Sequence, residues 1–458
     1  MSLFTRFLAL GTLAGALFVG GCSDDDDSTP ITPTPTDSRA ELAGNILGSR
    51  TLNADSVYVL KGFVLVQPGA VLTIPAGTRI EGDFATKGAL ITVRGTSTQA
   101  SGKIIADGTA SKPIIFTSSQ AVGTRKRGDW GGIVLNGLAP TNWPGGTGVG
   151  EGNTGAYGGG KVDDNSGILR YVRIEYGGTK ITPDNEINGL TLNGVGNATV
   201  IEHVQTHFIA DDGFEWFGGT VNAKWLVSSG NDDDAFDMDY GFSGKLQFLL
   251  ALQDPDLANR GLEMDNDASG SSNMTTVPTS GADMLSYDGT QTLTNPLIYN
   301  WTVIGTGKEK ANDDNNDGLY IRRNSQARFA NVLVTNFGNY SVVVDGSGSI
   351  GHFTGGVSYL KNSIFHGGKG GYAHRTSSGT ALQTIPAEWS TREADPMLTN
   401  ITFTTPDPRP KAGSPALSGA ADPTADPMSK GFFSAAPYVG AFDGSNNWLS
   451  GWTNFAKN

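Results

Sequence analysis

The sequence predicts an all-β solenoid, in which the chain coils on itself and short strands stack from coil to coil. Glycine supplies 64 of the 458 residues, about twice its usual share of ~7%, which disfavours long helices and suits short strands joined by tight turns. A small residue followed by two alternating apolar residues also recurs through the middle of the chain, mostly every 22 to 26 residues. A unit of that length cannot bury its own apolar face, but a stack of such units can.

The chain begins with an expected secretory signal over residues 1–21. Arg6 supplies the positive charge, and the apolar stretch 7–19 is too short to span a bilayer. The segment ends in Val-Gly-Gly before Cys22, which resembles a bacterial lipobox and implies that Cys22 carries a lipid. The alternative is an ordinary cleaved signal with an incidental cysteine. Cys22 is the single cysteine, which excludes an intramolecular disulfide and a zinc site of two or four cysteines.

Residues 22–44 are the expected linker between the lipid and the folded body. Asp24, Asp25, Asp26 and Asp27 form an acidic run, and a Pro/Thr-rich tract follows, which is typical of an extended spacer. Ser23 after the cysteine resembles lipoproteins sorted to the outer membrane, and the acidic run resembles export signals of surface-displayed lipoproteins. We therefore expect an outer-membrane lipoprotein, exposed at the cell surface, with its membrane contact made through the N-terminal lipid.

The repeat that defines the body has six copies, separated by intervals of 24, 22, 26, 57 and 23 residues, which begin at Gly189, Gly213, Ala235, Gly261, Gly318 and Ser341. A second alternating strand is expected between successive copies, at residues 200–204, 225–227, 246–248, 298–301 and 329–333. Because side chains alternate along a strand, one apolar set should point inward and the intervening residues outward.

Several segments of the body resemble bacterial right-handed parallel β-helix surface lipoproteins, which are largely uncharacterised. They are VYVLKGFVLVQPGAVLTIPAGTRIEGD at 57–83, GKIIADGTASKPIIFTSS at 102–119, DWGGIVLNG at 129–137, LRYVRIEYGG at 169–178, DPRPKAGSPAL at 407–417 and YVGAFDGSNNWLSGWTNF at 438–455. The resemblance implies that residues 45–458 form one right-handed parallel β-helix, with loop insertions at 138–167 and 266–295. It implies a distant fold-level similarity to pectate lyases and polygalacturonases, but it does not assign an activity.

An acidic column is expected on the outer face of this solenoid. Alternation places Glu215, Asp237 and Glu263 at the same position of successive coils, with Asp239 and Asp265 in the neighbouring column. Coils stack about 4.8 Å apart. Two carboxylates at that spacing repel by about 3.5 kcal/mol at an effective dielectric of ~20. A bound cation, a raised pKa or arginine pairing could relieve the repulsion, and a solvated acidic face without a specific role is the plain alternative.

Calcium is the cation that we expect, because it binds six to eight oxygen ligands. Two stretches match the first half of a calcium loop, with glycine at the turn, and neither has the later bidentate glutamate. The expected calcium ligands are Asp239, Asp265, Asp267, Asp313, Asn315 and Asp317. A transition metal is not expected, because His203 and His207 have no thiolate partner.

Two classes of function remain open at this point. In the first, the protein cleaves a glycan, with Glu215, Asp237 and Glu263 as catalytic carboxylates for a hydrolase, or with Arg322 as the base of a lyase. The motifs Asn-Thr-Asp, Gly-His-Gly and Arg-Ile-Lys of polygalacturonases are absent. In the second, which we favour, it is not an enzyme. It would bind a polysaccharide, a cell surface or an outer-membrane transporter along its flank.

The expected ligand-binding residues are Arg322 and Tyr320, which follow the acidic residues in the two columns. Four aromatic residues are further candidates for stacking on sugar rings: Trp130, Trp143, Tyr240 and Tyr287. Nucleic acid is not expected as a partner, because the formal net charge is −13 and phosphate binding needs an excess of lysine and arginine.

Overall fold

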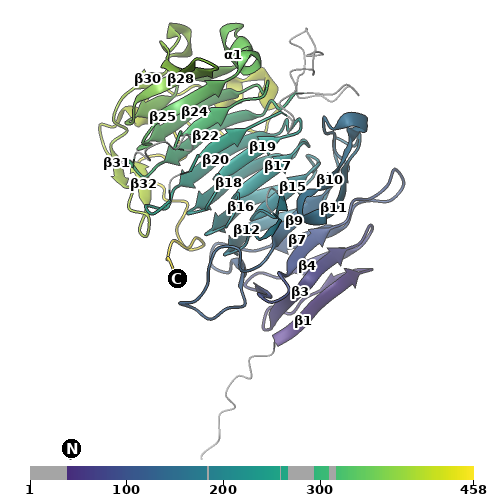
Figure 1. The fold of residues 1–458 in the computed structure, drawn as a ribbon. Coiled ribbons are helices and arrows are strands. Elements are labelled where there is room, and N and C mark those ends of the chain that lie inside the picture. The colour runs from purple at the N-terminus through teal and green to yellow at the C-terminus, as the bar shows by residue number, and fades with distance from the viewer. Residues whose placement is uncertain (1–38, 183–184, 258, 267–292, 309–315) are drawn as a thin grey trace, which may run out of the picture. The chain divides into compact units, whose positions relative to one another are not determined.

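A stack of parallel strands forms the body of the protein (Figure 1). The computed structural model describes residues 39–182, 185–257, 259–266, 293–308 and 316–458. Twenty-six strands join in one continuous sheet, in which all the pairings except that between β28 and β29 are parallel. Strands that are neighbours in the stack are roughly one coil apart in sequence. The predicted parallel β-solenoid is therefore confirmed.

One face of the coil carries the first strand of each predicted repeat. We call it the ladder face. Its strands pair in the order β6 (Ala89–Thr92), β9 (Gly132–Asn136), β15 (Leu190–Asn193), β17 (Phe214–Phe217), β19 (Phe236–Asp239), β21 (Leu262–Met264), β23 (Leu319–Ile321), β25 (Tyr340–Asp345) and β28 (Gly370–Thr376). All six predicted repeat copies lie in this series.

The second strand of each repeat forms a longer, bent series. It runs through β12 (Gly167–Glu175), β16 (Val200–His207), β18 (Ala223–Ser229), β20 (Lys245–Leu252), β22 (Leu297–Ile304) and β24 (Arg328–Thr335). The two halves of β12 pair with different strands, β7 (Lys103–Asp107) and β8 (Ile114–Ser118). The bend between the halves therefore turns one series of strands into two faces of the coil.

A left-handed residue makes each of these bends. The positions are Tyr171, His203, Trp225, Phe248, Asn300 and Asn331, with φ between 50° and 62°. Asparagine adopts this conformation readily, whereas the aromatic residues do so at a cost. Stacking of the aromatic rings offsets that cost, with centroids 4.2 Å apart between Tyr171 and His203 and 4.6 Å between His203 and Trp225.

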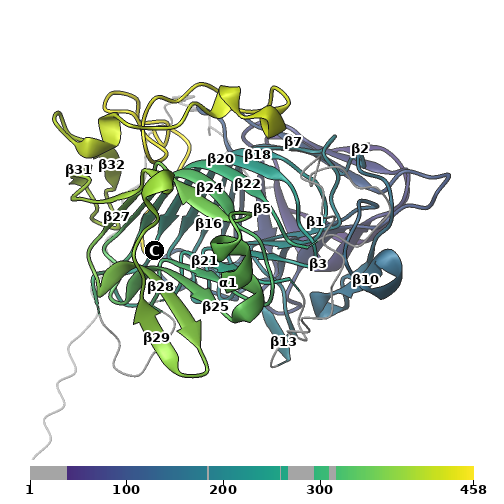
Figure 2. The same ribbon diagram turned by 90° about the horizontal axis from the view of Figure 1, so that it is seen from above.

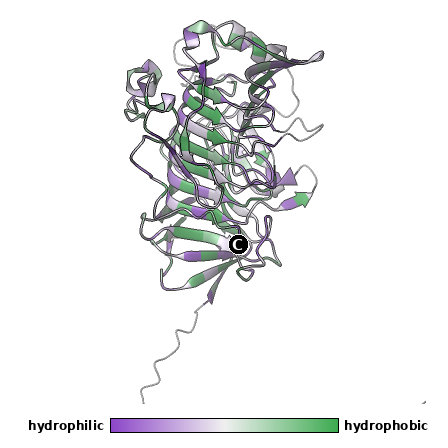
Figure 3. Cartoon of the chain, turned by 90° about the vertical axis from the view of Figure 1, so that its left-hand side faces the viewer, coloured by the Kyte–Doolittle hydropathy of each residue, from purple (hydrophilic) through white to green (hydrophobic). Residues whose placement is uncertain are grey.

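The inward side chains form one continuous apolar core. Phe214 and Trp216 of β17 lie over Phe236 and Met238 of β19, and all four are fully buried. The rings of Phe214 and Phe236 stack at 5.2 Å. Burial of each such side chain contributes about 1.5–3 kcal/mol, so the stack is stabilised at every coil. Figure 3 shows hydrophobic residues recurring along the stacked strands.

The first coils begin earlier than predicted. Strand β1 (Arg39–Ile46) pairs with β3 (Val57–Val66), and Leu42 and Ile46 are buried in the core. Residues 39–44, which the sequence assigned to the linker 22–44, therefore belong to the folded body, because Leu42 contributes to the core. The remaining strands of these coils are β2 (Arg50–Thr51), β4 (Val71–Ile74) and β5 (Arg79–Gly82).

Short elements lie in the insertion and near the last coils. The predicted insertion 138–167 holds η1 (Pro144–Gly146), β10 (Thr147–Gly150), η2 (Glu151–Asn153) and β11 (Gly155–Gly158), and β13 (Lys180–Thr182) pairs with β14 (Asn185–Glu186). The last coils add α1 (Ser347–Thr354), β26 (Tyr359–Lys361), β27 (Ile364–His366), β29 (Gly379–Leu382), η3 (Ala387–Trp389) and β30 (Arg392–Glu393). No helix among the described residues has the length and apolar character needed to cross a membrane.

The C-terminal segment returns along the outside of the bent series (Figure 2). It contains β31 (Leu398–Asn400), β32 (Asp407–Pro410), η4 (Pro415–Leu417), η5 (Pro423–Ala425) and η6 (Pro427–Ser429). Asn331 donates to the Ala421 carbonyl at 2.9 Å, and Asn300 donates to the Tyr438 carbonyl at 2.8 Å. Trp452 packs edge-on against Tyr171 and His203. The residues at the bends therefore hold the C-terminal segment in place.

This packing predicts a large loss of stability for Trp452→Ala. Trp452 is 1% exposed, and its indole nitrogen donates to the Trp448 carbonyl at 2.7 Å. Truncation of a buried tryptophan costs about 3–5 kcal/mol of unfolding free energy, which chemical denaturation measures. Leu47→Ala is the control, because Leu47 is 79% exposed and its truncation should change the free energy by less than about 0.5 kcal/mol. An equal effect of the two substitutions would contradict the assigned role of the C-terminal segment.

Candidate acidic metal centre

The three carboxylates of the predicted column occupy equivalent positions of successive coils. Glu215 lies opposite Asp237, and Asp237 lies opposite Glu263 in the parallel ladder. Thr191 precedes this column and Tyr320 follows it. The predicted register is therefore correct, and the close spacing of like charges is a feature of the folded protein.

These carboxylates are more buried than a solvated outer face would be. Glu215 is only 7% exposed. The insertion accounts for the difference, because it folds back beside the ladder face: Tyr157 of β11 packs on Phe217 at 6.2 Å, and Asn136 donates to the Thr154 carbonyl at 2.9 Å. β10 and β11 lie next to β15 and β17 in Figure 1. The expectation that the column projects freely into solvent is wrong at Glu215.

A second column of polar side chains lies in the turn that precedes each strand of the ladder face. The side chain of Asn188 accepts from the backbone N–H of Asp212 at 3.2 Å, and that of Asp212 accepts from Asp234 at 2.9 Å. Asp234 accepts in turn from Arg260 at 3.0 Å. One carboxylate oxygen of Asp212 and of Asp234 thus supports the neighbouring coil.

The two columns converge on an acidic cluster, which we define as Glu151, Asp211, Asp212, Glu215, Asp233 and Asp237. Carboxylate oxygens of Asp212, Glu215 and Asp237 all lie within 4.8 Å of one another, and so do those of Asp211, Asp212 and Asp233. Within the described parts of the chain, no salt bridge reaches any member of the cluster. Asn188 donates a hydrogen bond to Glu215.

Burial raises the pKa values of five carboxyl groups in this cluster, which are those of Glu151, Asp211, Asp212, Glu215 and Asp237. Burial, assisted by the neighbouring Asp233, raises the pKa of Asp211 to about 8. Burial, assisted by Glu186, raises the pKa of Glu151 to about 7. The pKa values of Asp212, Glu215 and Asp237 rise well above their ordinary range, chiefly through burial and then through the adjacent carboxylates. Without a cation, the cluster therefore holds protons at neutral pH.

Arginine pairing relieves the repulsion at the other end of the column. Arg260 forms ion pairs with Glu263 and, at 3.8 Å, with Asp234. Arg322 pairs with Glu263 and, at 2.6 Å, with Asp265, which Arg323 also contacts at 2.7 Å. Arginines thus balance the negative charges from Glu263 onward. The repulsion between Glu215 and Asp237 must be relieved in another way.

A single calcium ion fits the geometry of the cluster. Calcium binds oxygen at about 2.3–2.6 Å, so two oxygens on one ion lie at most about 4.6–5.2 Å apart. The three oxygens of Asp212, Glu215 and Asp237 satisfy that limit. Oδ1 of Asp237 is also buried, and it has no hydrogen-bond partner among the residues that the structure describes. A buried oxygen of this kind is costly unless an ion or a proton occupies the space beside it.

Residues 44–395 match the model of a family described as the pectate-lyase-like β-helix domain. The chain belongs to this family. The match confirms the right-handed parallel β-helix that the sequence resemblance implied. No curated protein matches the chain. Among solved structures, the chain is similar to the pectate lyase Pel9A, with 12% identity, a TM-score of 0.43, and coverage of 82% of this chain and 88% of that one.

The three predicted calcium ligands that the structure describes do not belong to the acidic cluster. Asp265 is ion-paired with two arginines, and Asp317 is fully buried beside Arg375 at 3.1 Å. Asp239, which is 7% exposed, accepts the backbone N–H of Tyr240 at 2.6 Å. Asp267, Asp313 and Asn315 lie outside the described residues. We therefore do not carry the partial calcium loops into the site.

The two predicted binding residues are engaged within the protein. Tyr320 is 5% exposed, its hydroxyl donates to Asp345, and the guanidinium groups of Arg260 and Arg375 lie over its ring at 4.2 and 5.0 Å. Burial of Arg322 is outweighed by Asp265 and Glu263, which raise the pKa of the Arg322 guanidinium. A more basic guanidinium is harder to deprotonate, so Arg322 is a poor candidate for the base of a lyase.

The predicted aromatic candidates differ in their surroundings. Trp130 is fully buried in the core, so the expectation that it stacks on sugars is wrong. Trp143 and Tyr240 stack on each other at 4.2 Å beside the insertion, and Tyr240 is 8% exposed. Tyr287 lies outside the described residues. His203 stacks on Trp225, and His207 packs against Phe208.

Sequence reasoning missed Glu151 and Asn188. Glu151 lies in a glycine-rich loop and shares no repeat position with the other members of the cluster. Asn188 does carry a signal, because it directly precedes the repeat copy that begins at Gly189, just as Asp212 precedes Gly213 and Asp234 precedes Ala235. Alignment of the residue before each copy would have revealed this column.

The raised pKa values predict that the metal-free protein loses stability with rising pH. The pKa values of Asp211 and Glu151 move from 3.8 and 4.5 to about 8 and about 7 on folding. Below about pH 3 the folded and unfolded states bind nearly equal numbers of protons at these groups. Above that the unfolded state ionises first, so stability falls as pH rises from about 4 and levels off once the folded-state pKa values of about 7 and about 8 are passed.

Chemical denaturation in EGTA at pH 5, 7 and 9 measures how the free energy of unfolding changes with pH. Asp237→Asn removes one titratable carboxyl group from the cluster and should flatten the decline, whereas Asp55→Asn, at an exposed position outside the cluster, should leave it unchanged. A stability that rises between pH 5 and pH 9 would show that the carboxylates of the cluster are ionised and satisfied without a metal.

Proposed function

We propose that the acidic cluster binds Ca²⁺ and that the resulting site serves to bind a polysaccharide along the ladder face. One observation carries the calcium part: carboxylate oxygens of Asp212, Glu215 and Asp237 lie within 4.8 Å of one another without a salt bridge from the described residues. Oxygen-only ligands at this spacing suit calcium rather than a transition metal. A bound ion would also neutralise the repulsion that otherwise forces protonation.

The glycan part of the proposal is supported by the family and by the shape of the ladder face. The family takes its description from pectate lyases. A solenoid presents a long, regular surface, along which an extended polymer can contact several coils. In this proposal the ion would be shared between the cluster and the polymer, and the ion would orient the polymer's oxygen atoms.

Glycan hydrolysis is the second candidate, and the raised pKa values favour it. A carboxyl group that stays protonated near neutral pH can act as a general acid, and a neighbouring carboxylate can act as nucleophile or base. Glu215 and Asp237 occupy adjacent coils, and burial raises the pKa of both. We place this candidate second because the same two groups also fit the calcium site.

The proposed lipid anchor concerns residues that lie outside the described part of the chain. We propose that Cys22 is lipidated and that the protein is an outer-membrane lipoprotein, displayed at the cell surface. The support is the lipobox-like sequence before Cys22 and the acidic, proline-rich tract after it. Binding to an outer-membrane transporter stays a prediction of the sequence.

The calcium proposal predicts a calcium-dependent gain in stability. At a free Ca²⁺ concentration of about 100 times Kd, the free energy of unfolding should rise by about 2.7 kcal/mol. Glu215→Gln and Asp237→Asn should abolish this gain, while Asp55→Asn should keep it. The gain between EGTA and calcium is compared within each variant, because either substitution also changes the metal-free protein.

The same variants separate binding from hydrolysis. Release of reducing ends from a panel of neutral and acidic polysaccharides, abolished by Asp237→Asn, would assign hydrolysis. Polysaccharide retention on an affinity gel without product release, lost in EGTA, would support binding. Superimposed melting curves with and without calcium would falsify the calcium site.

Substitution of the predicted lipidation residue provides a separate test. Cys22→Ser should move the protein from the membrane fraction to the soluble fraction of expressing bacteria, because the N-terminal lipid is the proposed anchor. Metabolic labelling with a fatty acid should mark the unsubstituted protein alone. Retention of the serine variant in the outer membrane would show that another part of the chain makes the attachment.

A further inference from the structure

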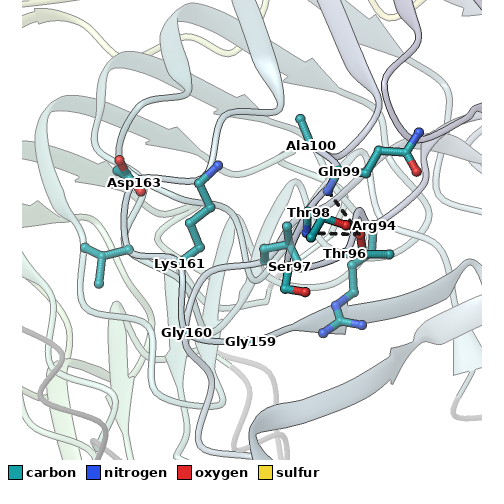
Figure 4. Close-up of a pocket in the computed structure, with 12 residues that line it drawn as sticks. Arg94, Thr96, Ser97, Thr98, Gln99, Ala100, Gly159, Gly160, Lys161 and Asp163 are labelled. Carbon is teal, nitrogen blue, oxygen red and sulfur yellow. Dashed lines mark hydrogen bonds between the residues drawn. The ribbon is translucent and has the colours of Figure 1, made fainter.

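A pocket of about 670 Å³, lined by hydroxyl-bearing, charged and apolar residues, lies beside the ladder face, away from the acidic cluster. Its two walls are the turn at residues 96–100 and the end of the insertion at residues 159–163, which face each other in Figure 4. Pockets for small molecules measure about 300–1,000 Å³, so this one is large enough for a sugar ring.

Glycine lets the chain pass close to neighbouring backbone on the insertion side of the pocket. A Cβ on Gly159 would lie 2.8 Å from the Leu138 carbonyl oxygen, and one on Gly158 would lie 2.6 Å from the Gly146 carbonyl oxygen. Both residues have a positive φ, of 154° and 92°, which other residues rarely adopt. The backbone therefore requires glycine at these two positions, which fixes the course of the chain along this wall.

The opposite wall is a hydrogen-bonded turn rich in hydroxyl groups. Thr96 donates its N–H to the Gln99 carbonyl at 2.8 Å, and its hydroxyl accepts from the N–H of Gln99 at 3.1 Å. Gln99 is also held to the Pro68 carbonyl at 2.9 Å. The exposed hydroxyl groups of Thr96, Ser97 and Thr98 are thus carried on an ordered turn at the edge of the pocket.

Two cations line the pocket in a protein whose formal net charge is −13. Arg94 donates through Nε to the Gly158 carbonyl at 2.6 Å, which leaves the terminal guanidinium nitrogens as donors. Lys161 is exposed on the facing wall. Neither forms a salt bridge within the described residues, although Lys161 lies near enough to the buried Asp164 to lower its pKa, which burial raises. Asp163 is the acidic residue among those that line the pocket.

The pocket is separate from the proposed calcium site. Thr92, two residues before Arg94, pairs with Leu135, Leu135 pairs with Leu192, and Leu192 pairs with Trp216. Three coil steps of about 4.8 Å therefore place the strand before Arg94 roughly 14 Å along the stack from the strand of Glu215. Occupation of the pocket does not require a metal in the cluster.

We propose that this pocket binds a sugar ring bearing one anionic group. Arg94 and Lys161 would hold the anion through charge-assisted hydrogen bonds, and the hydroxyl groups of the 96–100 turn would contact the ring hydroxyls. The anion is a carboxylate or a phosphate ester, since a guanidinium recognises both with the same geometry. The assignment stands whether or not the acidic cluster binds calcium.

Calorimetric titration of the full chain in low salt and EGTA tests the proposal, with glucuronate, glucose 6-phosphate and glucose as probes. At least one anionic sugar should bind more tightly than glucose by roughly tenfold or more, because a charged partner strengthens the hydrogen bonds. The tighter of the two identifies the anionic group. Arg94→Gln and Lys161→Gln should each weaken that binding by roughly tenfold.

Two further variants make the result independent of folding defects. Ser97→Tyr places bulk into the pocket from an exposed turn without a change of charge, and it should also abolish binding. Arg50→Gln removes an exposed arginine elsewhere and should not change the affinity. The proposal would be overturned if none of the three probes bound. It would also be overturned if the Arg94→Gln and Ser97→Tyr variants bound the anionic sugar as tightly as the unsubstituted protein does.

Discussion

Parallel stacking in register, about 4.8 Å per coil, is the constraint on which the rest of the structure depends. It turns a residue that repeats in sequence into a continuous column in space. For inward positions this multiplies contacts, as the stacked rings of Phe214 and Phe236 show. For outward positions it places like charges on neighbouring strands, only one coil apart. The same geometry thus stabilises the core and creates the acidic site.

The repulsion within the column of carboxylates is relieved in two different ways. From Glu263 onward, arginines on the adjoining coils balance the charge. At Glu215 and Asp237, burial and neighbouring carboxylates instead raise the pKa values, and the described residues supply no salt bridge. The unbalanced end is therefore where a cation or a proton must complete the structure, and it is where we place the function.

Segments outside the repeat decide how each face meets solvent. The insertion packs Tyr157 against Phe217 and contributes Glu151 to the acidic cluster, while its end forms one wall of the pocket beside the turn at residues 96–100. The C-terminal segment covers the bent series of strands, where Trp452 packs edge-on against Tyr171 and His203 at the bends. The repeat supplies regular columns, and these two segments give particular coils a distinct environment.

The sequence by itself determined the fold class and the register, because alternation and a period of 22 to 26 residues leave few ways to bury the apolar set. Glu215, Asp237 and Glu263 were placed in one column for that reason, and their arginine partners were among the expected remedies. The burial of that column was decided by tertiary structure, because Glu215 is covered by an insertion that has no periodic pattern. The same holds for Glu151, for the pairing of Asp265 and Asp317 with arginines, and for the buried position of Trp130. Contacts between segments far apart in the chain set charge balance and solvent exposure, and no local pattern of residues encodes them.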